Sequence, residues 1–242
     1  MPNLMASSST SSLEHRDVVL ERASKPLPAW YSPWVHLALS LSAGAAAIVW
    51  LATRPTDMRP WAYLAIPMAI TMANAIEYLV HRFPMHRRRK LTDRFFRGHT
   101  LIHHRYFDHR TLEFEQTSEA YFVLTTAHTT GLSIGLMLVL SLAITRLLGP
   151  DVAAVACITW IVYMLALELV HLAFHLPHTL QRRWPLRGHL FQWLRMHHRL
   201  HHDPHIMTSH NFNIVFPLTD WLLGTRLAPR QANVRTGDPA NG

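Results

Sequence analysis

Four long apolar runs alternate with segments that hold most of the charged residues. The runs are 34–53, 61–80, 120–145 and the stretch between Asp151 and Pro177. At about 1.5 Å per residue, a helix of about 20 residues crosses the roughly 30 Å of a membrane's hydrocarbon core. Short links at 54–60 and 146–151 join the runs in pairs. The pattern predicts an all-α integral membrane protein with four transmembrane helices in two hairpins.

The segments outside these runs are too short or too polar to span a membrane. Residues 184–196 mix Trp and Leu with Arg, which is typical of an interfacial amphipathic helix. Residues 212–223 are apolar but short, so they are expected to dip into the interface or to cover a site. The predicted divisions are an N-terminal tail and pre-membrane segment at 1–33, a membrane domain at 34–226 and a disordered tail at 227–242.

The net charge of +8 does not indicate nucleic acid, because the basic residues cluster beside the apolar runs. Lys and Arg number 3 in residues 1–33, 9 in 81–119 and 8 in 176–242, against 3 in the two links. The positive-inside rule therefore places both termini in the cytoplasm. Of the 19 histidines, 16 lie in 81–109 and 171–210, so we expect them on that same side.

The chain has a single cysteine, Cys157, so any metal chemistry must rest on histidine. Ten histidines form four clusters with spacing that suits chelation: His81 and His86; His99, His103 and His104; His171 and His175; His198, His201 and His202. On a helix, residues three or four apart share one side. The pairs 99/103, 171/175 and 198/201 are therefore each expected to bind one ion, and the doublets 103/104 and 201/202 to reach a second.

The first cluster has a spacing of five, and Pro84 is expected to break the helix there so that His86 folds back. Ten ligands shared by two ions leave about one open position on each, as a catalyst requires. Imidazole suits Fe, Zn, Cu and Ni, so the ligand type alone does not choose among these metals. The pattern predicts a di-metal site in a helical cap at the cytoplasmic ends of the helices.

These clusters resemble those of the fatty acid hydroxylase and sterol desaturase superfamily of membrane di-metal oxidases. The family pattern is HxxxxH, HxxHH or HxxxHH, a pair near the end of the last helix, and HxxHH. The resemblance covers about residues 60–226, including HHRLHHDPHIMTSHNFNIVFPLTDWLLGT. It implies a membrane catalytic domain whose ten clustered histidines bind two iron ions, although zinc is possible in a purified form.

The resemblance also implies a function in lipid biosynthesis. Dioxygen would be the co-substrate, and the enzyme would hydroxylate or desaturate a fatty acyl, sterol or related isoprenoid lipid. No haem domain is fused to the chain, so a separate electron donor protein and reductase are the expected partners. A carotenoid hydroxylase is the nearest alternative, because HRFPMH and HRLHH fit that branch as well.

Six further residues are candidates for supporting roles. Glu77 and Glu168 precede His81 and His171 by four and three positions, where a carboxylate could accept a ring N–H and fix its tautomer. Asp203 and Asp220 are possible outer partners of the last cluster. His178 and His197 are possible extra ligands, since His197 is also four residues from His201.

Two functions of other classes stay open. A haem-binding cytochrome subunit needs axial histidines within the helices, where only His36 and His128 lie. A membrane zinc carrier needs a polar path at the middle of the bilayer, where Asn74 is almost the only polar residue.

Overall fold

The computed structural model describes residues 31–229. The predicted tails at 1–33 and 227–242 therefore lie almost wholly outside the described residues. Within 31–229 every regular element is helical, and no strand occurs. The predicted helical class is confirmed for this part of the chain.

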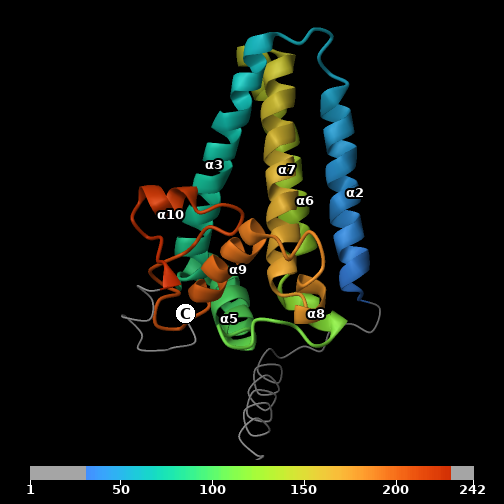
Figure 1. Ribbon diagram of the computed structural model, residues 1–242. Coiled ribbons are helices and arrows are strands. Elements are labelled where there is room, and N and C mark those ends of the chain that lie inside the picture. The colour runs from blue at the N-terminus through green and yellow to red at the C-terminus, as the bar shows by residue number, and fades with distance from the viewer. Residues whose placement is uncertain (1–30, 230–242) are drawn as a thin grey trace, which may run out of the picture.

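Four helical stretches are long and apolar enough to cross a membrane, at Pro33–Ala52, Pro60–Met85, Thr129–Leu148 and Pro150–Phe174. They comprise α2 (Pro33–Ala52), α3 (Ala65–Val80) with the short helices at its two ends, α6 (Ala127–Leu148) and α7 (Pro150–Phe174). Figure 1 shows them as a bundle of long helices in which α7 contacts the other three. The four predicted membrane-length helices are confirmed.

Small residues let these helices pack closely. Ala65, Ala69 and Ala73 recur every four positions on α3, which places them on one side, and each is at most 8% exposed. Close approach of this kind is how helices associate in lipid, where burial of apolar surface gives no advantage. In contrast, Leu132 and Leu147 of α6 are 74% and 80% exposed, as lipid-facing residues are. Composition and packing therefore agree on a membrane bundle.

The third span starts later than predicted, at Thr129 rather than at residue 120. Residues Thr117–Phe122 instead form a short 3₁₀ helix, η5. The Glu119 carboxylate closes its start by accepting the backbone N–H groups of Glu115 and Gln116, at 3.0 and 3.2 Å. The Phe122 carbonyl at its end accepts from His103. Residues 120–122 thus belong to the cap and not to the span, because these polar contacts hold η5 there.

The end of the bundle away from the histidines is closed by one ion pair. Arg59 Nε donates to Asp151 Oδ2 at 2.7 Å, and Arg59 Nη2 donates to the Leu148 carbonyl at 2.8 Å. Gly149 has a φ of 104°, in the region that disfavours side chains, and it joins α6 to α7. These contacts connect the 53–59 link to the α6–α7 turn.

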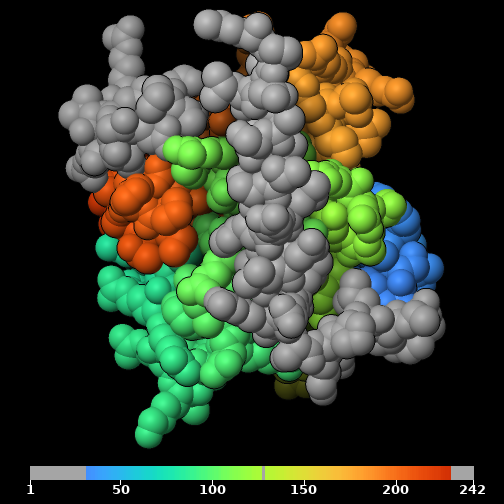
Figure 2. Space-filling view, turned by 90° about the horizontal axis from the view of Figure 1, so that it is seen from below, coloured from blue at the N-terminus to red at the C-terminus, as the bar shows by residue number. Residues whose placement is uncertain are grey.

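Short helices form a cap at the opposite end of the bundle. Between α3 and α6 lie η2 (His81–Met85), η3 (Lys90–Thr92), α4 (Asp93–Phe96), η4 (Arg97–His103), α5 (His104–Tyr106) and η5; after α7 come α8 (His178–Gln181), α9 (His189–His201) and α10 (Leu218–Leu222). At the far end, η1 (Pro60–Leu64) precedes α3. Seen from the cap end, the 81–126 connection and the part of the chain after α7 make up much of this face (Figure 2).

The two segments after α7, at 184–196 and 212–223, do not lie only on the surface of the cap. The predicted amphipathic helix begins at His189, after Pro185 and Gly188, and extends to His201, so its last turns carry buried histidines. Residues 212–222, the covering segment, lie against α3 and contact His81 and His201 through Phe212, which corresponds to one of the two expected placements. Asn213 Nδ2 donates to the Asn74 carbonyl at 2.9 Å, and the Thr219 hydroxyl donates to Asn74 Oδ1 at 2.7 Å.

Candidate metal centre

The ten clustered histidines meet in two groups of five. Within each group the ligand atoms all lie within 4.8 Å of one another. Group one is His81, His86, His99, His104 and His201; group two is His103, His171, His175, His198 and His202. The groups touch where the rings of His104 and His202 stack with centroids 4.2 Å apart. Four separate stretches of sequence therefore form two adjacent sets of five imidazoles.

The division between the groups differs from the predicted pairing. The predicted pairs 81/86 and 171/175 stay together, while His99 and His103 fall in different groups, as do His198 and His201. As predicted, each doublet is split between the groups, so that His103 and His104 lie in different groups, as do His201 and His202. His198 instead pairs with His202, four residues on.

Two π-helical turns explain the grouping of the first two clusters. Both η2 and η4 are π-helical, with hydrogen bonds that close over five residues rather than four. His81 and His86, like His99 and His104, are five apart and share group one. Pro84 lies inside η2 and has no N–H to continue a regular α-helical ladder. The expected break after His81 is thus a wider turn that keeps both rings on one side.

Backbone carbonyls determine which nitrogen of each ring faces the group. Nδ1 of His103 lies 2.8 Å from the Phe122 carbonyl, and Nδ1 of His175 lies 2.7 Å from the Leu112 carbonyl. His202 makes the same contact with the Phe107 carbonyl. A carbonyl only accepts, so each Nδ1 carries the proton and each Nε2 presents a bare lone pair.

The Nε2 atoms are closer than their lone pairs permit without a cation. The five Nε2 to Nε2 distances are 2.8 Å for 81/99, 2.9 Å for 86/201, 3.1 Å for 99/104, 3.1 Å for 175/198 and 3.0 Å for 198/202. His99 and His198 each contact two partners, and one hydrogen could serve only one of them. The contacts therefore cannot all be hydrogen bonds.

In the pair His86 and His201, neither Nε2 atom carries a hydrogen that could form a hydrogen bond. His201 Nδ1 donates to the His210 carbonyl at 2.9 Å. The Thr100 hydroxyl donates to the Met85 carbonyl at 2.6 Å, so its oxygen is left to accept from His86 Nδ1 at 3.2 Å. Both Nε2 atoms then lack a hydrogen, yet they lie 2.9 Å apart. Two nitrogens bound at about 2.0–2.1 Å and at right angles to one ion would be about 2.9 Å apart.

The surroundings of the two groups are dry. Eight of the ten rings are at most 5% exposed, and His99 and His171 are half-buried. Phe107, Phe174 and Phe212, each with no exposed surface, lie against His175, His198 and His201. The Nε2 atoms of His103 and His171 are buried without a hydrogen-bond partner. Such groups are costly unless an ion binds them, so the residues present fit a pair of metal ions.

Burial lowers the pKa of the cap histidines, and the neighbouring imidazoles lower it further. The pKa of His103 falls to about 4 and that of His86 to about 2, from the usual 6.5. The pKa values of His104, His198, His201 and His202 are well below 6.5 for the same reasons. The rings therefore stay neutral at physiological pH, in the form that binds metal.

We expect the folded cap to lose stability in acid. Since each folded-state pKa is below 6.5, the unfolded chain binds more protons than the folded one below that pH. Stability is then full above about pH 6.5 and falls towards about pH 4, by at least the roughly 1.4 kcal/mol per pH unit of one fully shifted histidine. Thermal unfolding in detergent across this range measures the effect, and a flat profile would contradict it.

Glu77 does not contact His81 in the way we predicted. Its carboxylate accepts from the Tyr163 hydroxyl and from the Ile214 N–H, both at short distance. His81 Nδ1 donates instead to the Phe212 carbonyl, two residues from Ile214. Glu77 thus supports His81 through the backbone of the covering segment, because that segment lies between them.

Glu168 also differs from expectation. Glu168 lines a small cavity between α6 and α7 with Thr130, Ser133 and Trp160, and its Oε1 is buried without a hydrogen-bond partner, so it does not hold the His171 ring as predicted. Asp203 accepts the His205 N–H at 2.9 Å and shapes the turn after α9.

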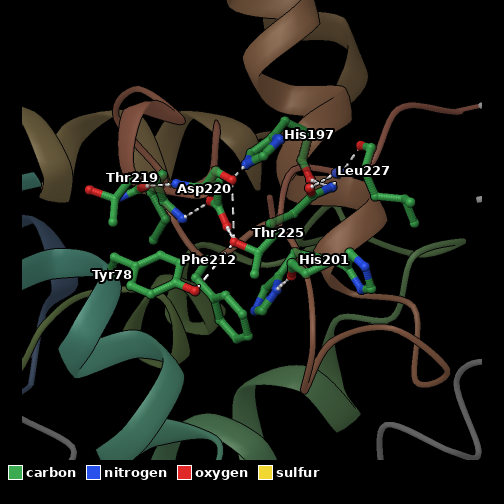
Figure 3. A network of polar contacts seen from close by, with 12 residues as sticks. Tyr78, His197, His201, Phe212, Thr219, Asp220, Thr225 and Leu227 are labelled. Carbon is green, nitrogen blue, oxygen red and sulfur yellow. Dashed lines mark hydrogen bonds and ion pairs between the residues drawn. The ribbon is translucent and has the colours of Figure 1, made fainter. Parts of the chain in front are cut away.

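The two possible extra ligands belong to neither group. His178 is exposed on α8. His197 is buried, but its Nε2 lies 3.4 Å from Asp220 Oδ2, and Figure 3 shows its ring beside that carboxylate. Asp220 in turn accepts from the Asn213 N–H and the Thr225 hydroxyl, at 2.6 and 2.7 Å. Its contacts are therefore with His197 and with the residues after α9.

Sequence reasoning missed the acceptors that orient the rings. These are main-chain carbonyls of Phe107, Leu112, Phe122, His210 and Phe212. A carbonyl is present at every position, so the sequence carries no signal for the ones that are used. Asn211 and Asn213 flank the His210 and Phe212 carbonyls, but asparagine alone does not indicate which carbonyl a histidine contacts.

No family model, curated protein or solved structure matches this chain.

Proposed function

We propose that this protein is a membrane-bound di-iron oxidoreductase that uses dioxygen to hydroxylate or desaturate a lipid. The observation that carries the proposal is the pair of five-histidine groups, whose bare Nε2 atoms approach to 2.8–3.1 Å at the end of a membrane-length helical bundle. Five imidazoles per ion leave a position for dioxygen if the coordination is octahedral-like. A closed structural site would leave none.

When bound, the two ions would supply the reduction of dioxygen that oxidation of an unactivated C–H bond requires. The ten histidines bind the ions, and the carbonyls that accept their Nδ1 protons fix the rings before any substrate arrives. The three buried phenylalanines exclude water from the centre, which protects an oxidising site from side reactions. Electrons are to come from a separate donor protein.

The position of the centre supports a lipid as the substrate. His171 lies in the last turn of α7, a candidate span, and η2 continues α3 directly. A lipid could therefore keep its apolar tail in the bilayer and bring a carbon near its polar end to the ions. The basic residues of the cap favour the cytoplasmic side for this centre by the positive-inside rule.

Untargeted lipid analysis of cells that lack the gene tests the proposal. We expect one lipid class to accumulate that differs from its missing product by one oxygen atom, for hydroxylation, or by two hydrogen atoms, for desaturation. Metal analysis of the protein purified after iron supplementation should give two ions per chain. An unchanged lipid profile, or zinc uptake by vesicles that contain the protein, would contradict an oxidase.

A further inference from the structure

Two ligands of group one depend on a single short segment after α9. His201 Nδ1 donates to the His210 carbonyl at 2.9 Å, and His81 Nδ1 donates to the Phe212 carbonyl. One residue, Asn211, separates the two acceptors. The Nδ1 acceptors described for group two are instead the carbonyls of Phe107, Leu112 and Phe122. The two groups are therefore held by different parts of the chain.

Asn211 is fixed on every side. Its φ of 60° lies in the left-handed region, which Asn tolerates better than most residues. Its backbone N–H donates to the Thr225 carbonyl at 3.0 Å, and its Oδ1 accepts the Leu227 N–H at 2.7 Å. Its Nδ2 donates to the carbonyls of His197 and Leu227, both at 3.2 Å (Figure 3). This fully buried side chain thus bonds α9 to the end of the described chain.

The residues that follow are held just as firmly. Asn213 and Asp220 exchange two bonds, from the Asn213 N–H to Asp220 Oδ2 at 2.6 Å and from the Asp220 N–H to Asn213 Oδ1 at 3.1 Å. Glu77 accepts the next N–H, that of Ile214. In the absence of these bonds, the Phe212 carbonyl would have no fixed place relative to His81. None of these side-chain bonds goes to a group two histidine.

We propose that Asn211, Asn213 and Asp220 are positioning residues for one metal site alone, that of group one. The inference rests on the proposed function in that the two histidine groups must bind metal. Each ring whose Nδ1 loses its acceptor can rotate or change tautomer, which turns a bare Nε2 away from the ion. Loss of such an outer partner typically costs about 10- to 100-fold in metal affinity. The cost falls on one ion, because group two takes its acceptors from residues 107–123.

The test is release of metal from the purified protein at increasing chelator concentration. Asn211→Asp keeps Oδ1 and tolerance of the left-handed φ but loses both Nδ2 bonds. We expect one of two ions to leave at a chelator concentration about 10- to 100-fold lower than in the native protein, while the second leaves at the native concentration. Ser209→Ala is the matched control, since its hydroxyl bonds only Ile206 and the His210 ring.

Double variants identify the ion that is lost. Adding His201→Ala to Asn211→Asp should leave one tightly held ion, because both changes affect group one. Adding His175→Ala should leave no tightly held ion. The retained ion also reports that the rest of the cap is folded, and Asp220→Asn, a milder change, should repeat the selective loss.

The outcomes distinguish failure of the proposed function from failure of the positioning role. A native protein that binds fewer than two ions would contradict the proposed function. If the native protein binds two and the Asn211 and Asp220 variants hold both with native affinity, the positioning inference is wrong while the proposed function stands. Equal weakening of both ions would also overturn it, since the segment would then support the whole cap.

Discussion

Replacing His201 with Ala is expected to abolish the oxidised lipid and to leave one metal ion on a chain that otherwise binds two. His201 has no exposed surface, and its Nε2 lies 2.9 Å from that of His86 in group one. Alanine removes one of the five ligands of group one and leaves a buried cavity in its place. The loss of activity should exceed the roughly 10- to 100-fold cost of losing an outer partner.

The same experiment on group two gives a matched result. His175→Ala removes a ring equally buried, whose Nε2 lies 3.1 Å from that of His198, and should also leave one ion and no product. His178→Ala is the control, because this exposed histidine lies in neither group. Product formation by membranes and ions per chain are measured together. If His201→Ala retains product or His178→Ala loses it, the proposed ligand set is wrong.

The sequence was sufficient to find the ten histidines but not to divide them. Counting three or four residues along an α-helix pairs His99 with His103, whereas the π-helical turn of η4 pairs His99 with His104. A π-helical turn is a local exception to the regular ladder, and at 97–103 no residue marks it as Pro84 marks η2. The clustering of histidines can be read from their order along the chain, but their division into two groups depends on the backbone conformation.

The supporting contacts were hidden for a related reason. Glu77 and Glu168 have the spacing of carboxylates that hold a ligand ring, yet main-chain carbonyls occupy that role for five of the ten histidines. Glu77 instead bonds Ile214, 137 positions away in sequence. Contacts between residues so far apart in sequence form only when residues 212–222 pack on α3. The apolar runs could be recognised because their length is a local property.

Removing both ions with a chelator is expected to open the cap while the membrane helices stay folded. Without cations, five pairs of Nε2 atoms lie 2.8–3.1 Å apart inside a dry site, and hydrogen bonds cannot satisfy all of them. A ligand at 1,000 times its dissociation constant stabilises the folded state by about 4.1 kcal/mol per site, and chelation removes this contribution twice. The spans keep their backbone hydrogen bonds because lipid offers no alternative partners.

Hydrogen exchange measured with and without chelator distinguishes local opening from global unfolding. Exchange should increase in 86–126 and 176–229, and stay unchanged in α2 and in the central turns of α6 and α7. Restoring iron should restore protection, whereas magnesium, which prefers oxygen ligands, should not. Unaltered protection of α9 after complete metal removal would contradict this expectation. It would mean that packing around Phe174 and Phe212 holds the histidine rings in place without a cation. The close Nε2 contacts would then not be evidence for a metal site.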